Sequence, residues 1–99
     1  MKFIVTEKNP HQGVILTITD TDIIGKKFEE GKKQLDLASK FYAGEEKDLD
    51  YVKTRLEDAY IVHLTGKNAV SFGIEIGLVD KHKVITVSGI PHAEVLVER

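Results

Sequence analysis

The stretch that decides the fold is YIVHLTGKN at residues 60–68. Its first five residues are almost entirely apolar, which predicts a short strand over Tyr60–Leu64. A helix is predicted over Lys67–Ile76, and it is largely buried because only two positions past its first turn are polar. The helix makes the connection to the next strand, Val84–Val87, too long for a hairpin. We therefore expect this strand to run parallel to Tyr60–Leu64.

A hairpin is predicted at the N-terminus. Val14–Thr19 has Val14, Leu16 and Ile18 on one side, which is the period of a strand. Phe3–Glu7 is its expected partner, because the connecting residues 8–13 are rich in turn formers.

A short helix is predicted after this hairpin. Ile24 and Phe28 lie four residues apart, as they do on one face of a helix. Asp20 or Thr21 is a suitable N-cap, and Gly31 is a suitable end.

The middle of the chain predicts a strand, a loop and a second helix. Gln34–Ala38 is the expected strand, and residues 40–47 have the character of a loop. Asp48 is the expected N-cap of the helix. Its apolar stripe consists of Leu49, Val52, Leu56 and Ala59.

The predicted order is β-β-α-β-α-β-α-β-β in a single domain over residues 1–99. The last strand, Ala93–Val97, follows the connection Ser88-Gly89-Ile90-Pro91-His92. Alternating elements in the middle and hairpins at the ends predict an α/β (α+β) fold, in which about three helices cover one mixed β-sheet.

Composition narrows the function classes. The net charge of −2 argues against binding nucleic acid over a broad surface, although it permits a local basic face. The absence of cysteine excludes a disulfide framework, a thiolate zinc site and a cysteine nucleophile. No apolar run approaches the ~18 residues of a membrane span, and the N-terminus is charged too early for a signal peptide, so we expect a cytoplasmic protein.

Four segments together resemble one family. They are Pro10-His11-Gln12-Gly13, Ile24–Gly31, Phe41-Tyr42-Ala43-Gly44-Glu45 and Gly89-Ile90-Pro91-His92-Ala93. In order and spacing they are similar to the short archaeal proteins of the domain of unknown function 424 family. The resemblance covers nearly the whole chain and implies an archaeal cytoplasmic protein, but it supplies no established activity. A link to RNA or translation is our inference from proteins of this kind and is shown by no residue here.

Both prolines of the chain precede a histidine, at His11 and His92. Each pair falls in a predicted hairpin connection, where proline restricts the backbone just before the histidine. Such histidines suit proton transfer near neutral pH, so His11 and His92 are candidate ligand-binding residues. The alternative is a pair of exposed turn histidines, or imidazoles that bond to loop carbonyls.

A candidate anion site lies at Thr65-Gly66-Lys67-Asn68. A helix N-terminus offers free amide N–H groups and positive dipole charge, to which Lys67 would add. Parallel strands would bring these residues close to Gly89 and His92 at one edge of the sheet. The alternative is a Thr N-cap followed by a glycine that permits the turn.

A candidate RNA-binding segment contains Lys40, Phe41 and Tyr42. Exposed aromatic rings beside a lysine stack on bases, whereas buried rings only fill the core. Lys26 and Lys27 extend this segment into a possible basic face. Acidic residues are interleaved with these lysines, so a solvated face of mixed charge is the alternative.

No metal site or cofactor is expected, because no metal-ligand spacing is present. His63 falls within the apolar run and is expected to be a hydrogen-bonded histidine of the core or the sheet face.

Three functional hypotheses remain open, and whether the chain is an enzyme stays undecided. The leading hypothesis is a non-catalytic module that binds RNA or a ribonucleoprotein in archaeal translation or RNA metabolism. The second is a small enzyme or anionic-ligand-binding domain that uses His92, His11 and the helix start. The third is a structural partner that forms a homodimer through an open edge at Ala93–Val97.

Overall fold

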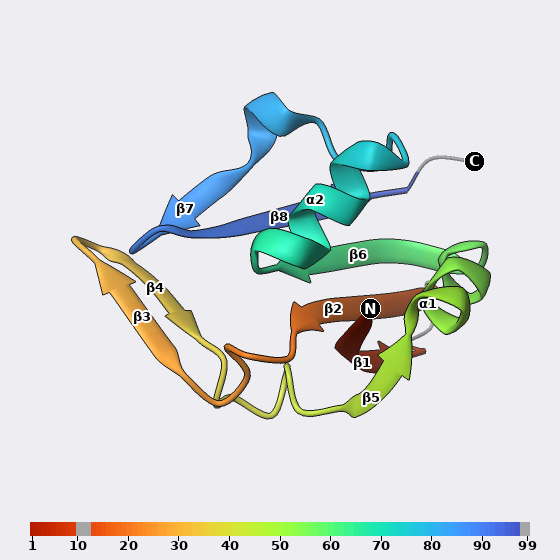
Figure 1. Cartoon of the computed structure of the whole chain (residues 1–99), viewed down its shortest axis with the longest axis horizontal. Helices are drawn as coiled ribbons and strands as arrows, with labels where there is room; N and C mark the ends of the chain where they lie inside the picture. The colour runs from red at the N-terminus through yellow and green to blue at the C-terminus, as the bar shows by residue number, and fades with distance from the viewer. Residues whose placement is uncertain (10–12, 98–99) are drawn as a thin grey trace.

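A six-stranded sheet in the order β5-β1-β2-β6-β8-β7 forms the centre of the computed structural model, which describes residues 1–9 and 13–97 (Figure 1). Its strands are β1 (Lys2–Lys8), β2 (Val14–Asp20), β5 (Glu45–Asp48), β6 (Ala59–Thr65), β7 (Ile85–Val87) and β8 (Ile90–Leu96). A separate hairpin contains β3 (Lys27–Glu30) and β4 (Lys33–Asp36). The helices are α1 (Leu49–Leu56), α2 (Lys67–Glu75) and the 3-10 turn η1 (Lys81–Lys83).

The sheet is mixed, as predicted. Strand β2 is parallel to β6, and the remaining pairs are antiparallel. Strands β6 and β7 run in the same direction, which confirms the prediction for Tyr60–Leu64 and Val84–Val87. They are not neighbours, however, because β8 lies between them and is antiparallel to both.

Both helices cover the same face of the sheet (Figure 1). Alternate residues of the strands, including Phe3, Leu16, Ile18, Val62 and Leu64, pack there against the helices and are fully buried. Helix α1 begins where predicted, since the Asp48 carboxylate accepts the backbone N–H of Tyr51 at 2.9 Å. The opposite face is called the helix-free face below.

The predicted helix at Asp20–Gly31 is wrong, and the structure contains two α-helices rather than three in the residues it describes. The segment forms a turn followed by β3. Gly25 interrupts a helix because its φ of 84° is left-handed, and Gly31, with φ 60°, belongs to the two-residue turn of the β3–β4 hairpin. Phe28 therefore pairs across the hairpin with Leu35 instead of stacking on Ile24.

Two further predictions need correction. Residues 45–47, expected to be the end of a loop, instead belong to strand β5 together with Asp48, because they pair with β1. The connection between β7 and β8 is only Ser88-Gly89, whose positive φ values of 51° and 80° suit a tight hairpin turn. Pro91 and His92 consequently lie inside strand β8 and not in a turn.

Candidate functional site

The loop between β4 and β5 crosses the helix-free face. The Thr6 hydroxyl donates to the Phe41 carbonyl oxygen at 3.5 Å, which places the loop over β1. Gly44 lies directly on this strand, since a Cβ there would be 2.1 Å from the Val5 carbonyl oxygen. Only glycine allows so close an approach, so Gly44 permits the crossing that brings Phe41 over the sheet.

The loop completes a histidine–aromatic cluster, which consists of Phe41, Tyr42, His63 and His92. The Phe41 ring contacts the rings of Tyr42 and His63 edge to face, each with centroids 5.0 Å apart. The rings of His63 and His92 lie 6.1 Å apart. All four residues are partly buried: the His63 side chain is 15% exposed, and Tyr42 packs against a second buried cluster of Ile23, Leu35, Leu37 and Val87.

Charged and polar groups surround the cluster. The Lys8 ammonium lies 5.1 Å from the centre of the Phe41 ring, which is a cation–π distance. The His63 Nδ1 atom is 3.4 Å from a carboxylate oxygen of Glu94. The Thr65 hydroxyl shares a hydrogen bond of 2.8 Å with His92 Nδ1, and Thr65 itself is fully buried.

Both cluster histidines favour the neutral form. Burial lowers the pKa of His63 below its usual value, although the nearby Glu94 carboxylate acts in the opposite direction. Burial also lowers the pKa of His92, and the charge that His63 acquires on protonation lowers it further. Burial, followed by the charges of Asp36 and Glu94, raises the pKa of the Tyr42 hydroxyl. The cluster is therefore uncharged at neutral pH, and it can stack on flat groups and form hydrogen bonds.

The predicted anion site holds a carboxylate of the chain itself. Asp20, at the end of β2, accepts the backbone N–H groups of Asn68 at 2.9 Å and Ala69 at 2.8 Å. Gly66 is the N-cap and Thr65 is the last residue of β6, so the alternative of a Thr N-cap is wrong. Gly66 allows the carboxylate to approach, since a Cβ there would lie 2.3 Å from Asp20 Cγ.

A small cavity of about 240 Å³ adjoins this helix start. Its lining includes Gly66, Lys67 and Asn68, together with the carboxylates of Asp20 and Asp22. Burial raises the pKa of Asp20, while its two backbone hydrogen bonds lower it. The acidic groups oppose the binding of a further anion at this position.

The remaining predicted site residues are dispersed. Lys26 and Lys27 are exposed beside the β3–β4 hairpin, and Lys27 forms an ion pair with Glu29 at 3.2 Å. Lys40 is exposed in the crossing loop, and Gly89 belongs to the β7–β8 turn. His11 lies outside the described residues. The structure thus brings Phe41, Tyr42, Thr65 and His92 together, and it places Lys26 and Lys27 on a separate hairpin.

His63 is the residue of this cluster that the sequence interpretation did not select as a candidate. It was correctly placed on a sheet face, because Val62 and Leu64 on either side point toward the helices. The useful signal is the alternation of the strand, which puts His63 on the same face as Ile61 and Thr65. Its contact with Phe41 comes from a segment 22 residues away in the sequence (63 − 41) and has no local signature.

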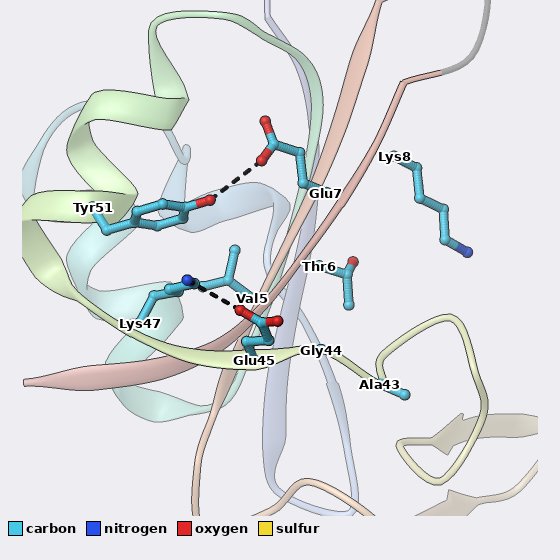
Figure 2. Close-up of a pocket in the computed structure, with 9 residues that line it drawn as sticks. All are labelled: Val5, Thr6, Glu7, Lys8, Ala43, Gly44, Glu45, Lys47 and Tyr51. Carbon is cyan, nitrogen blue, oxygen red and sulfur yellow. Dashed lines mark hydrogen bonds and ion pairs between the residues drawn. The ribbon is translucent and has the colours of Figure 1, made fainter.

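A larger cavity of about 350 Å³ opens at the edge of β1. It lies where β5 leaves β1, and its lining includes Glu7, Lys8 and Lys47. Figure 2 shows Lys8 on one side of the β1 ribbon and Tyr51 on the other. Glu7 is held on the Tyr51 side, because Arg55 Nε donates to its carboxylate at 2.7 Å. Lys8 thus lines this cavity and also contacts the histidine–aromatic cluster.

Two further findings concern metal and membrane binding. Among residues 1–9 and 13–97, no group of three or more His, Cys, Asp or Glu side chains is arranged to hold a metal ion. In the same part of the chain, neither helix is both long enough and apolar enough to span a membrane.

Comparison with known proteins gives a family and a fold. The model of a family described as "Protein of unknown function (DUF424)" matches residues 7–97. No curated protein matches the chain. The crystal structure of an uncharacterized conserved protein from Methanopyrus kandleri is similar, with a TM-score of 0.79 and 17% identity over 100% of this chain and 96% of that one. At this identity, the likeness shows a shared fold.

Proposed function

This chain belongs to the DUF424 family, and from that premise we propose that it is a non-catalytic cytoplasmic module that binds RNA or a ribonucleoprotein in archaeal translation or RNA metabolism. The observation that carries the proposal is the position of Phe41, which packs edge to face on His63 above the helix-free face. A cation, Lys8, lies next to the same ring.

Unpaired bases are bound by this combination of groups. Single-stranded bases stack on aromatic side chains, and both phenylalanine and histidine are used in this way. Phe41 and His63 are both partly exposed, and a base would stack on the part of the Phe41 ring that its neighbours leave uncovered. The two histidines, which are neutral, also offer hydrogen bonds to base edges.

A phosphate group needs a cation close to the stacked base, and Lys8 supplies one. The cavity beside Lys8 also contains Lys47, whose ammonium lies 3.1 Å from Glu45 and 4.7 Å from the centre of the Tyr51 ring. Lys47 is on the Tyr51 side of β1, so only Lys8 lies beside the stacking surface (Figure 2). With about one phosphate contact, the affinity should depend only weakly on salt, with a slope of roughly −0.7 in log–log form. A weak dependence agrees with the net charge of −2, which does not favour a long electrostatic interface.

The second hypothesis, a small enzyme or anionic-ligand-binding domain, has one contact in its favour. The hydrogen bond between Thr65 and His92 would hold an imidazole ready for proton transfer. At the helix start that the sequence suggested as an anion site, the Asn68 and Ala69 N–H groups instead donate to the Asp20 carboxylate. We therefore place RNA binding first.

The proposal is tested with fluorescently labelled single-stranded RNA of uridine and adenine, titrated with the protein. Phe41→Ala is expected to weaken binding by about 1–3 kcal/mol, or roughly 5- to 150-fold in Kd. The matched control is Tyr60→Ala, since Tyr60 is also exposed, at 37%, but its position in β6 is in phase with Val62 and Leu64, away from the cluster.

Circular dichroism and the unfolding midpoint verify that the variants are folded. If Phe41→Ala unfolds the domain, the less disruptive change His63→Gln addresses the same stacking surface. The proposal fails if the wild type binds no RNA, or if a folded Phe41→Ala variant binds as tightly as the wild type.

A further inference from the structure

The cavity at the edge of β1 adjoins the histidine–aromatic cluster in two ways. Lys8 lines the cavity, and its ammonium lies 5.1 Å from the centre of the Phe41 ring. Ala43 and Gly44, which follow Phe41 in the crossing loop, form another part of the cavity wall. The volume of about 350 Å³ is within the range of small-ligand sites. A nucleotide whose base stacks on Phe41 therefore has this cavity beside it.

The cavity exposes backbone groups of β1. The Val5 carbonyl oxygen is directed toward β5, since a Cβ on Gly44 would lie 2.1 Å from it. In an antiparallel pair the direction of the backbone groups alternates along the strand, so Glu7 directs its N–H and C=O to the same side as Val5. The pairing of β1 with β5 ends at Val5. The Glu7 N–H and C=O therefore face the cavity, which continues around the edge of β1 from the Lys8 side to the Tyr51 side (Figure 2).

The ion pairs of the cavity leave one carboxylate accessible. The Glu7 carboxylate accepts from Arg55 Nε at 2.7 Å and from the Tyr51 hydroxyl at 3.4 Å. Glu45 forms an ion pair with Lys47 at 3.1 Å, and its side chain is 80% exposed. Because a carboxylate has about four lone-pair positions, Glu45 keeps acceptor capacity for another donor.

This lining fits a hydroxyl group better than a phosphate. The carboxylates of Glu7 and Glu45 repel an anion on the Tyr51 side of the cavity. A hydroxyl both donates and accepts, so it can donate to Glu45 while it accepts from Lys47 or from the Glu7 N–H. The 2′-hydroxyl of ribose is such a group, and DNA lacks it.

We propose that the cavity binds the ribose of the nucleotide next to the stacked base, with its 2′-hydroxyl donating to the Glu45 carboxylate. The proposal rests on the RNA-binding function proposed above and adds to it the selection of RNA over DNA. Lys8 lies between the two subsites, where it contacts the phosphate that links the two nucleotides. Stacking on Phe41 does not itself select RNA, because every base has a π-face.

The test compares two labelled single strands of the same sequence, an RNA of uridine and adenosine and a DNA of deoxyuridine and deoxyadenosine. Bases and phosphates are identical in the two strands, so the ratio of their Kd values at one salt concentration reports on the sugar. The wild type should bind the RNA roughly 3- to 10-fold more tightly, as expected for one additional hydrogen bond. Glu45→Ala should remove this preference without weakening the binding of DNA.

The matched control is Glu46→Ala. Glu46 is the next residue of β5, so its side chain points to the other side of the strand, where it forms an ion pair with Lys2 at 3.7 Å. The same charge is removed, and the preference for RNA should be retained. Both glutamate side chains are more than half exposed, so both variants are expected to fold.

The outcomes separate this inference from the function on which it rests. Absence of binding by either strand overturns RNA binding itself. Equal affinities for RNA and DNA, both weakened by Phe41→Ala, retain the stacking surface and overturn the ribose subsite. A preference for RNA that Glu45→Ala leaves unchanged also overturns the subsite, because the 2′-hydroxyl is then recognised elsewhere.

Discussion

The carboxylate of Asp20 accepts the backbone N–H of Asn68 at 2.9 Å, although the two residues are 48 positions apart in the sequence. This contact joins the end of β2 to the first turn of α2. A carboxylate at a helix N-terminus satisfies free N–H groups and interacts favourably with the helix dipole. The start of α2 is thus capped from another strand rather than by its own N-cap residue, Gly66.

Replacing Asp20 with alanine should destabilise the fold. Two backbone N–H groups would lose their acceptor, and we expect the free energy of unfolding to fall by about 1–3 kcal/mol. Asp20→Asn keeps one side-chain oxygen and should cost less. Urea unfolding measures both variants, with Asp22→Ala at the exposed neighbouring carboxylate as the control. Equal stability of Asp20→Ala and Asp22→Ala would contradict this account of the cap.

Gly66→Ala should be more damaging than Gly89→Ala. Both glycines have positive φ, so each substitution incurs backbone strain. Gly66, with φ 108° and ψ 162°, lies in a region that essentially only glycine adopts, whereas Gly89 has φ 80°. At Gly89 the new Cβ meets no atom within 4 Å, whereas at Gly66 it would lie 2.3 Å from Asp20 Cγ. The difference between the two unfolding free energies measures the close approach together with the greater backbone strain at Gly66. A Gly66→Ala variant as stable as Gly89→Ala would show that the carboxylate moves aside without cost.

Stability should fall on acidification through the cluster histidines. Burial lowers the pKa of His63 and His92 in the folded state, so the unfolded chain binds protons first as the pH falls below about 6.5. Their contribution is therefore complete above that pH and decreases as the pH falls toward their folded pKa values. His63→Gln should flatten the dependence of the unfolding free energy on pH between about 7 and 5.

The control for this experiment is His82→Gln. The His82 side chain is exposed in η1, so the slope of the wild type should be retained. Burial raises the pKa of Asp20, and the comparison of variants with the wild type removes its shared contribution. If His63→Gln and His82→Gln have the same pH dependence, the partly buried His63 imidazole does not control acid stability.

Lys8→Ala should weaken RNA binding and lower its salt dependence. If the ammonium beside Phe41 contacts one phosphate, its removal should change the log–log salt slope by roughly 0.7. Lys53→Ala, at an exposed lysine of α1, is the control and should leave the slope unchanged. An unchanged slope in Lys8→Ala, despite weaker binding, would assign Lys8 to positioning Phe41 instead of contacting phosphate.

Local patterns were sufficient for much of the fold. The N-terminal hairpin, the Asp48 cap and helix α2 each follow from a period of two or about 3.6 residues, or from a cap beside such a segment. The pattern failed at residues 45–47, which are all charged and belong to a strand only because β1 supplies hydrogen bonds. It also failed at Ile24 and Phe28, whose spacing suggested a helix across Gly25.

The sequence by itself determined the family, the mixed sheet and the faces of the central strands, because these depend on residue types and on their spacing along the chain. Only the tertiary structure decided which side chains meet. Strand order and register bring Thr65 to His92 across 27 residues and carry Phe41 onto His63. Such contacts leave no signal in the local periodicity, because each residue fits the pattern of its own strand or loop whether or not its distant partner is present. For the same reason, the helix start that suggested an external anion is bonded to Asp20, a residue of a distant strand.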